Sequence, residues 1–544
     1  MKKKGTKGTA VMLAAAMVLG MLAGCGGAKQ ETGKATEKNE SVSGETKTAA
    51  DENAEDVEFT FSIGNSNTTG GFSFDPAVDY QSQKTVTMGI GETLFVLDDE
   101  TKEVCPHLAE SIEQKDDTTW EITVRNGITF SNGRALDAEA VKQALEYIFA
   151  NNTRIGTMAD CASMEADGQI LTIKTNGIVA IMPRILTEVN TVIFDTEASN
   201  DYSKGVIGTG PYILESVDGD GNCELVRNEN YWQGKPVASK IHTKAGLDAS
   251  ALTLALQSKE LDWAGIQTSD LPLFENNPEY KVLNYNPGRV YYLYLNPNYT
   301  FTEDDALREA LTYAFDREAI LNGVYGGRGT VSKGIFPKDS AYYNEKEQAG
   351  GKDYDADQAK KILADAGYVD TDGDGFLEKD GETVHLNIIC YSANSFPTLS
   401  EVIQAELKAI GIDSEITVSD AIVDDCNKGE YNIATYAYNT QTLGDCYNYL
   451  EPVFKTGGTA NFTGYSNAEV DALLDEMKVT ADNDKRAELA KAIQEKVFDA
   501  NEHIYLLHIN RYNVVKSGVE GITPMFGSDN GNCMILWQFT KKDE

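Results

Sequence analysis

The sequence predicts an α/β fold with open sheets of mostly parallel or mixed strands. Segments with alternating apolar residues, typical of strands, interleave along the chain with segments of helical periodicity. The chain has 544 residues. It shows no internal repeat, and it is too long for one hydrophobic core, so we expect two or three domains.

Strands are expected where apolar and polar residues alternate between turn signals. The first example is 58–63, and the second, 119–124, is followed by Asn126-Gly127, a pair typical of tight turns. The further expected strands are 223–227, 291–296, 385–391, 414–418, 431–438 and 503–509.

Helices are expected where an N-cap residue precedes a stripe of apolar residues. In 137–150, Asp137 is the expected N-cap, and Val141, Leu145 and Ile148 form the stripe. The further expected helices are 249–257, 304–322, 356–366, 400–410, 468–479 and 484–499.

The first 24 residues are expected to be a lipoprotein signal peptide. A lysine-rich start leads into the apolar run 10–23, which is short for a membrane span and typical of a signal h-region. Leu22-Ala23-Gly24-Cys25 resembles the bacterial lipobox, in which the cysteine is lipidated and becomes the first residue of the mature chain. The alternative is an ordinary signal peptide with an incidental cysteine.

Residues 25–56 are expected to be a disordered linker tethered at Cys25. The segment is almost entirely small or polar, with Val42 its one branched apolar residue, so it buries too little surface to offset the entropy of ordering. A coil of this length spans roughly 30 Å, enough to hold a globular body just clear of a membrane.

The body of the protein is strongly acidic. The formal net charge is −38, and loss of four lysines with residues 1–24 would move it to −42. Nucleic acid and anionic lipid headgroups are repelled by such a surface, so we expect neither as a partner.

The cysteines do not indicate a metal site. Seven follow Cys25, an odd number without any C-x-x-C pair, at 105, 161, 223, 390, 426, 446 and 533. Buried free thiols are expected, with one or two disulfides as the alternative.

Several blocks, in one order along the chain, carry a resemblance to a known family. One is T-W-E-I-T-V-R-N-G-I-T-F-S-N-G at 119–133; the others lie at 106–111, 136–141, 208–212, 226–232, 234–236, 255–262, 291–296, 307–320 and 354–367. Together they resemble the family 5 solute-binding proteins, the extracytoplasmic receptors of oligopeptide, dipeptide and nickel ABC importers. The resemblance covers about residues 58–540.

The resemblance implies a two-lobed periplasmic-binding-protein-like fold (type II, cluster C). Mixed sheets flanked by helices would form two lobes joined by a hinge, with the ligand cleft between them. Lobe I would comprise 57–288, with an inserted subdomain at about 94–205, and lobe II 289–510; residues 511–544 would return to lobe I.

The implied function is capture of an extracellular solute, above all a short peptide, by lobe closure and its delivery to a membrane permease. The chain has no G-x-x-x-x-G-K-[ST] loop, so a separate subunit would hydrolyse ATP. We expect a monomer that needs no cofactor, held by its lipid anchor on the outer face of the cell membrane, or on the periplasmic side where an outer membrane exists.

Three segments are candidates for contacting the ligand. The loop after the first strand is either a binding loop or a plain glycine-rich turn. Tyr291 and Tyr292 alternate on a strand, so only one of them can face the cleft, and a place in the core is the alternative for either. A third segment ends the strand 431–438. The candidate residues are Asn65, Ser66, Asn67, Thr68, Thr69, Tyr291, Tyr292, Tyr436, Tyr438 and Asn439.

Asp445 completes the ligand candidates. In peptide receptors of the family, an aspartate soon after this strand pairs with the peptide's α-ammonium group, but Gln441 or Thr442 stands at that position. Either Asp445 substitutes for it, or the ligand is not an ordinary free peptide.

A nickel–chelator complex is the alternative ligand. The blocks 130–133, 137–140 and 226–232 resemble the nickel-binding subgroup. The position of the histidine that helps hold the metal in that subgroup corresponds to about Thr435 here. The five histidines of this chain lie outside the expected cleft loops: His107, His242, His385, His503 and His508.

One segment resembles the first part of an EF-hand calcium loop. Carboxylates stand at loop positions 1, 3, 5 and 9, Gly375 at position 6, and Phe376 would offer its carbonyl, but the acid of position 12 is missing or displaced. The segment is either a site for a structural calcium ion or an acidic hairpin. Its predicted ligands are Asp370, Asp372, Asp374, Phe376 and Glu378.

An exported hydrolase is the alternative from a different class. The chain contains neither H-E-x-x-H nor G-x-S-x-G, and no cysteine in a protease context. We therefore do not expect an enzyme.

Overall fold

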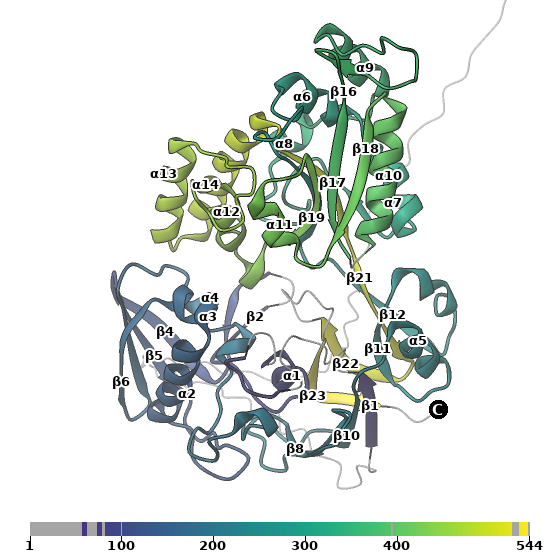
Figure 1. The fold of residues 1–544 in the computed structure, drawn as a ribbon. Coiled ribbons are helices and arrows are strands. Elements are labelled where there is room, and N and C mark those ends of the chain that lie inside the picture. Colours follow the sequence, from purple (N-terminus) through teal and green to yellow (C-terminus); the bar gives the residue numbers. More distant parts are fainter. Residues whose placement is uncertain are drawn as a thin grey trace, which may run out of the picture. The chain divides into compact units, whose positions relative to one another are not determined.

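The computed structural model describes residues 57–62, 73–78, 82–98, 101–392, 395–524 and 533–541. The chain from Ala54 onward forms one compact unit. Three larger sheets, with four, six and seven strands, and three two-stranded ribbons organise it (Figure 1).

The seven-stranded sheet joins the start of the described chain to a segment near its end. Its order is β12 (Tyr280–Tyr285), β21 (Arg511–Lys516), β11 (Trp263–Ile266), β1 (Val57–Ser62), β10 (Ala238–Lys244), β9 (Cys223–Arg227) and β8 (Tyr212–Val217). The central strand β1 is parallel to both neighbours, whereas β21 runs antiparallel between β11 and β12. Phe59 and Phe61 of β1 are fully buried, which explains the alternation seen in the sequence.

A four-stranded antiparallel sheet is inserted between β3 and β8. Its order is β4 (Ala109–Asp116), β5 (Thr119–Val124), β7 (Ile170–Thr175) and β6 (Cys161–Asp167). Helices α2 (Ala138–Asn151) and α3 (Thr153–Ala159) connect β5 to β6. Asp137 caps α2 as predicted, because its carboxylate accepts a hydrogen bond from the Ala140 N–H.

The six-stranded sheet lies between two hydrophobic clusters. Its order is β14 (Gly329–Val331), β20 (His503–Ile509), β13 (Arg289–Leu295), β19 (Ile433–Asn439), β17 (His385–Tyr391) and β18 (Asp413–Ser419). Helix α10 (Phe396–Ala409) lies along β17 and β18 (Figure 1). Alternate residues of β13 enter different clusters, Tyr291 on one face and Tyr292 on the other.

Two short connections join the seven-stranded and six-stranded sheets. Residues 286–288 link β12 to β13, and Asn510 alone links β20 to β21. We call the part built on the seven- and four-stranded sheets (57–285 and 511–524) lobe I, and the part built on the six-stranded sheet (289–509) lobe II. The two connections lie side by side because β13 and β20 are paired in the sheet.

The remaining elements are short ribbons and helices. The ribbons are β2 (Phe95–Leu97) with β3 (Val104–Pro106), β15 (Glu378–Lys379) with β16 (Glu382–Thr383), and β22 (Val519–Pro524) with β23 (Cys533–Lys541). The helices are α1 (Ser82–Thr87), α4 (Met182–Ile185), α5 (Ala249–Gln257), α6 (Asp305–Tyr313), α7 (Arg317–Tyr325), α8 (Glu345–Gly350), α9 (Ala356–Asp365), α11 (Ile422–Lys428), α12 (Tyr447–Phe454), α13 (Ala468–Val479) and α14 (Asn483–Val497). Five 3₁₀ turns complete the set: η1 (Val189–Thr191), η2 (Tyr202–Lys204), η3 (Thr268–Leu273), η4 (Thr442–Gly444) and η5 (Phe498–Ala500).

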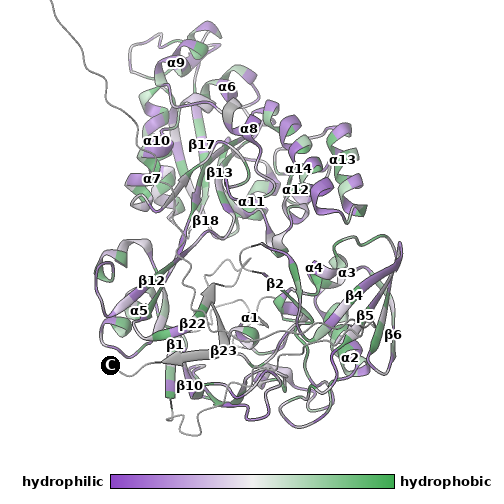
Figure 2. Ribbon diagram, turned by 180° about the vertical axis from the view of Figure 1, so that it is seen from behind, coloured by the Kyte–Doolittle hydropathy of each residue, from purple (hydrophilic) through white to green (hydrophobic). Residues whose placement is uncertain are grey.

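Most predicted elements are present, and one prediction was wrong. The segment 304–322 is two helices, α6 and α7, because Asp316 caps a new helix by accepting a hydrogen bond from the Ala319 N–H. Helix α10 also begins four residues before its predicted start, at Phe396, with Pro397 in its first turn. Green and purple residues alternate around α13 and α14 in Figure 2, as expected of amphipathic helices.

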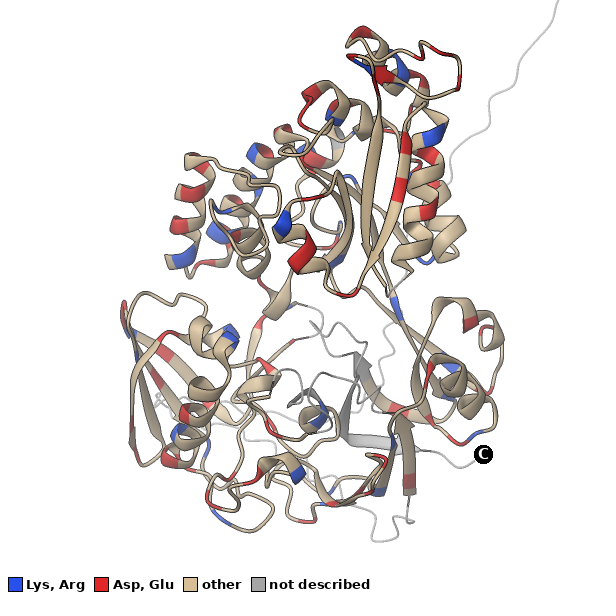
Figure 3. Ribbon diagram, viewed as in Figure 1, with Lys and Arg blue, Asp and Glu red and all other residues tan. Residues whose placement is uncertain are grey.

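The acidic character of the sequence is spread over the described chain. Figure 3 shows acidic residues on many helices and strands of both lobes rather than on one element. None of the described helices has the length and apolar character needed to cross a bilayer. The six cysteines whose side chains are described are free thiols, four of them buried.

Two histidines lie on β20 in lobe II, His508 buried and His503 half-buried. The ring of His503 stacks on Tyr505, with a centroid distance of 6.2 Å, and meets the edges of Tyr294 and Phe454. Burial lowers the pKa of His503 to about 3 and that of His508 to about 4. An unfolded histidine titrates near ~6.5, so below that pH the unfolded chain binds protons that the folded chain excludes.

We therefore expect stability to fall as the pH drops from about 6.5 toward the folded pKa values. The variant His503→Phe keeps the ring stack and removes one titrating group. Between pH 7 and pH 4.5 it should lose about 2 to 3 kcal/mol less stability than the parent, measured by thermal unfolding. The control is His385→Gln, since His385 lies at the surface beside Asp413; equal acid sensitivity of the parent and His503→Phe would contradict the prediction.

Candidate ligand cleft

A large cavity lies beside the connections between the two lobes. Its volume is about 830 Å³, within the range of about 300–1,000 Å³ that is typical of small-ligand sites. Lobe I, the 286–288 connection and lobe II all contribute to its wall. The lining residues are Thr101, Lys102, Glu103, Arg184, Tyr285, Asn286, Gly288, Pro337, Asp339, Ser340, Ala341, Tyr342, Gln441, Gly444, Asn483, Asp484, Ala487, Glu488 and Lys491.

The wall of this cavity, which we call the interlobe cavity, carries charges of both signs. Its cationic residues are Lys102, Arg184 and Lys491, and its acidic residues are Glu103, Asp339, Asp484 and Glu488. Arg184 is buried, and its guanidinium donates to the carbonyl oxygens of Lys102 (2.9 Å) and Leu443 (3.0 Å). The carboxylates thus outnumber the lysines, a balance that suits a zwitterionic or cationic solute.

Gln441 presents a neutral amide to the interlobe cavity. Its side-chain oxygen accepts a hydrogen bond of 2.7 Å from the Ser340 hydroxyl, which fixes the orientation of the amide. Gly288 lies against it: a Cβ there would come within 3.1 Å of the amide nitrogen, and the φ of 72° is left-handed. A glycine is therefore needed where the connection passes the amide.

A second cavity, of about 530 Å³, lies at the carboxyl ends of β17 and β19 in lobe II. Tyr391, Phe396 and Tyr436 give it aromatic walls, and Asp420 and Asp424 contribute acidic groups. Arg289 lines this cavity, and the adjacent residue Gly288 lines the interlobe cavity.

The expectation that Asp445 offers its carboxylate to a ligand is wrong for this structure. Asp445 is fully buried and forms a two-point ion pair with Arg486, with distances of 2.7 and 2.6 Å. The Tyr342 hydroxyl and the Tyr447 N–H donate to the same carboxylate at 3.3 and 2.8 Å. With its acceptor sites occupied, Asp445 has no room for a ligand's ammonium group.

Arg486 extends this clamp to the helices of lobe II. Its Nη1 donates to the carbonyl oxygens of Met477 (2.6 Å) and Thr480 (2.8 Å) at the end of α13. The Tyr342 hydroxyl also donates to the Gly444 carbonyl at 3.3 Å. Asp445 therefore holds together the segments that form the lobe II wall of the interlobe cavity.

Tyr291 and Tyr292 both lie in the core of lobe II, so neither faces the cleft. Tyr291 is 2% exposed and stacks on Phe396 with a centroid distance of 5.4 Å. Tyr292 is fully buried, and its hydroxyl donates to Tyr294 at 2.8 Å. Burial raises the pKa of Tyr292 well above its usual value, so the phenol stays neutral.

The other ligand candidates have different outcomes. Tyr436 is half-buried and lines the second cavity, whereas Tyr438 packs on Tyr449. The side-chain oxygen of Asn439 is buried without a partner, at the end of β19 opposite Arg289. Asn65, Ser66, Asn67, Thr68, Thr69 and Cys25 lie outside the described residues.

The histidines do not line either cavity. On β20, His508 is buried and His503 is half-buried, and His107 hydrogen-bonds to Glu92 at 2.9 Å. His242 and His385 pair with acidic residues within their own sheets. Among the described residues, the cavities therefore hold no imidazole for direct coordination of a metal.

Sequence reasoning missed Arg184, the 337–342 segment and the start of α14. These segments are more than a hundred residues apart along the chain and meet only in the fold. A local pattern cannot identify such residues, since each segment alone is an ordinary loop or helix end.

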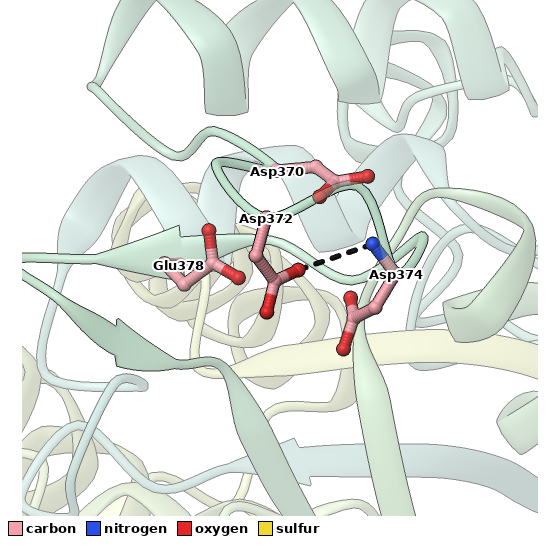
Figure 4. Close-up of side chains that lie close together, drawn as sticks. All are labelled: Asp370, Asp372, Asp374 and Glu378. Atoms are coloured by element: carbon pink, nitrogen blue, oxygen red, sulfur yellow. Dashed lines mark hydrogen bonds between the residues drawn. The ribbon is translucent and has the colours of Figure 1, made fainter.

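The predicted calcium ligands converge in one turn (Figure 4). One oxygen from each of Asp370, Asp372, Asp374 and Glu378 lies within 4.8 Å of the others. Backbone N–H groups order the turn: Gly373 and Gly375 donate to Asp370, and Asp374 donates to Asp372 at 3.1 Å. Four hard oxygen donors suit Ca²⁺, and Phe376 follows in the same turn. The calcium site stays a prediction.

Comparison with known proteins decides the family. Residues 103–461 match the family model described as "Bacterial extracellular solute-binding proteins, family 5 Middle". The chain is a family 5 solute-binding protein. The predicted family and two-lobed fold are thereby confirmed, and the protein is the substrate-binding receptor of an ABC importer, an extracytoplasmic component.

Individual relatives agree with this family. This binding protein is 27% identical over 418 residues to the nickel-binding protein NikA of Staphylococcus aureus, covering 76% of this chain and 82% of the relative. It is 26% identical over 447 residues to the oligopeptide-binding protein AppA of Bacillus subtilis, covering 78% and 81%. The solved structure of a nickel ABC transporter protein from Bacillus halodurans superposes with a TM-score of 0.74 at 28% identity, over 89% of this chain and 99% of that one.

Removal of one partner of the buried ion pair should destabilise the binding protein strongly. Asp445→Asn leaves the Arg486 guanidinium buried without its counter-ion, which is expected to cost about 3–5 kcal/mol in urea unfolding. Lys346→Gln is the control, since it breaks the exposed pair with Glu495 and should cost less than about 1 kcal/mol. An Asp445→Asn protein of normal stability that no longer binds a free-amine peptide would restore Asp445 to the ligand site.

Calcium should raise the unfolding temperature of the binding protein if the acidic turn holds the ion, because only the folded turn gathers the carboxylates. The Asp370→Ala and Asp374→Ala variants should lose this shift, and EGTA should reverse it in the parent. Asp365→Asn, on the neighbouring helix α9, is the control. The absence of a shift at millimolar calcium would contradict the prediction.

Proposed function

We propose that the solute captured by this receptor is a short peptide or a polar solute of similar size, bound in the interlobe cavity. The observation that carries the proposal is the cavity itself, which takes its wall from lobe I, from the 286–288 connection and from lobe II. A solute that touches both lobes favours the conformation in which they approach each other, by the difference between its affinities for the closed and open states.

The chemistry of the wall supports a zwitterionic solute. Lysines and carboxylates line the same cavity, so both ends of a peptide can be compensated without one fixed anchor. Gln441 does not supply a charged partner for the peptide's amine, because its amide is neutral and already accepts a hydrogen bond from Ser340. This supports recognition of the amine by several groups rather than by one charged residue. Asp339, Asp484 and Glu488 are the carboxylates available to an ammonium group.

A metal–chelator complex is the second candidate solute. The relatives include proteins named as nickel-binding, and the second cavity offers the aromatic walls of Tyr391, Phe396 and Tyr436. Such a ligand would bring its own donor atoms, since the described cavity walls lack imidazole. We propose in either case that the protein binds its solute without catalysis.

Native mass spectrometry of protein purified without refolding should identify the solute. A mass increment of a di- to pentapeptide is expected, because tightly held solutes survive purification. An increment that contains nickel and disappears after chelator removal would favour the metal complex, and turnover of any solute at an enzyme-like rate would reject the receptor.

Matched variants on α14 connect the solute to the cavity. Glu488→Gln removes a lining carboxylate and should weaken binding of a free-amine peptide up to about fivefold, measured by calorimetry. Glu495→Gln lies on the same helix outside the lining and should leave the affinity unchanged. Equal affinities of the two variants and the parent would place the peptide elsewhere.

We further propose that Cys25 carries a lipid anchor that holds the receptor, as a monomer, on the outer face of the membrane. The lipobox-like Leu22-Ala23-Gly24-Cys25 and the polar segment after it support this anchor. Cys25→Ser should release the protein into the medium with unchanged solute affinity, measured by fractionation and immunoblotting. Retention of the variant on the cell would refute the anchor.

A further inference from the structure

One residue of lobe II is inserted into the hydrophobic cluster of lobe I. Leu443, in the turn η4, is only 5% exposed and belongs to the cluster formed by β1, β5, α2 and their neighbours. Among the described members of that cluster, it is the only one from 289–509. The contact between α4 of lobe I and η4 brings it there.

The backbone at Leu443 adopts a conformation that leucine rarely takes. Its φ of 61° and ψ of 22° lie in the left-handed region, where the Cβ of an L-residue crowds its own backbone. Such a conformation persists only when the surrounding contacts outweigh its cost. The contacts of Leu443 with lobe I are the ones that offset the cost of its left-handed backbone.

Arg184 holds the same turn from the side of lobe I. Its guanidinium donates to the Leu443 carbonyl at 3.0 Å and to the Lys102 carbonyl, within lobe I, at 2.9 Å. A weaker contact of 3.4 Å reaches the side-chain oxygen of Asn483 on α14. Arg184 therefore bridges the two lobes, with its charge directed at backbone carbonyls.

Gly444 makes this approach sterically feasible. Its φ is 68°, and a Cβ at this position would lie 2.7 Å from the Arg184 Nη1 and 3.2 Å from the Lys102 carbonyl oxygen. From the side of lobe II, the Asp445–Arg486 pair and Tyr342 fix the residues that follow the turn. The turn is thus anchored in lobe II while its tip is buried in lobe I.

We infer that Leu443 and Arg184 form a closure latch, which favours approach of the lobes before a solute arrives and so raises the fraction of receptor that can bind. The inference rests on the proposed function, because Arg184 of the latch and Gly444, the residue after Leu443, also line the interlobe cavity. A receptor that is only partly closed shows an affinity reduced by the closed fraction, so the latch sets affinity without selecting among solutes.

Small-angle X-ray scattering of solute-stripped protein tests the latch without any ligand. The variants Leu443→Ala and Arg184→Gln should each increase the radius of gyration relative to the parent, while circular dichroism shows an intact fold. Leu443→Met should restore the parent value, since it refills the apolar site. The controls are Leu254→Ala, which removes an exposed leucine of lobe I, and Arg134→Gln, which breaks an ion pair within lobe I.

Unchanged radii in both folded latch variants would overturn the inference. A Leu443→Ala protein that fails to fold would also overturn it, because the contact would then belong to a permanent core. Each latch variant should weaken the affinity for two solutes of different charge by the same factor, about tenfold. The first solute is any that copurifies, and the second is another that is found to bind. A loss confined to one solute would assign these residues to solute contact instead; absence of solute binding would reject the proposed function but leave the scattering result valid.

Discussion

The two short connections between the sheets are the constraint on which the rest of this structure depends. Residues 286–288 and Asn510 are the described backbone links between lobe I and lobe II, and both leave from paired strands of one sheet. Side-chain contacts elsewhere must therefore determine how closely the lobes approach. Gly288 shows how tight the arrangement is, because the connection passes directly over the amide of Gln441.

Hydrophobic and capping patterns in the sequence predicted most individual elements of the fold. The strands 119–124, 223–227, 385–391 and 503–509 and the helices 249–257 and 468–479 agree with their predicted bounds. The helix 304–322 was mispredicted because its apolar residues keep a helical period across Asp316, and the sequence alone does not show that this aspartate caps a second helix. Periodicity reports which side of a segment is buried more reliably than where the backbone turns.

The candidate site was harder to predict than the fold for a physical reason. Tyr291 and Tyr292 have the residue type of ligand-contacting groups, but six strands with a cluster on each face bury both sides of β13. Asp445 is a similar case, since the distant Arg486 converts it from a candidate ligand into a structural anchor. The groups that do line the interlobe cavity come from segments without distinctive local patterns. A site between two lobes forms only where the folded lobes come together, so no local pattern predicts it. Only the family resemblance pointed to it.

The tyrosine-rich core of lobe II has a consequence for spectroscopy. Tyr292, Tyr294 and Tyr505 gather around His503. The four tryptophans of the chain, at 120, 232, 263 and 537, all fall outside 289–509. Indole fluorescence of this receptor therefore originates outside lobe II, whose ultraviolet chromophores are tyrosines. Tryptophan emission thus reports on the chain outside 289–509, and unfolding of the lobe II core is followed through tyrosine absorbance instead.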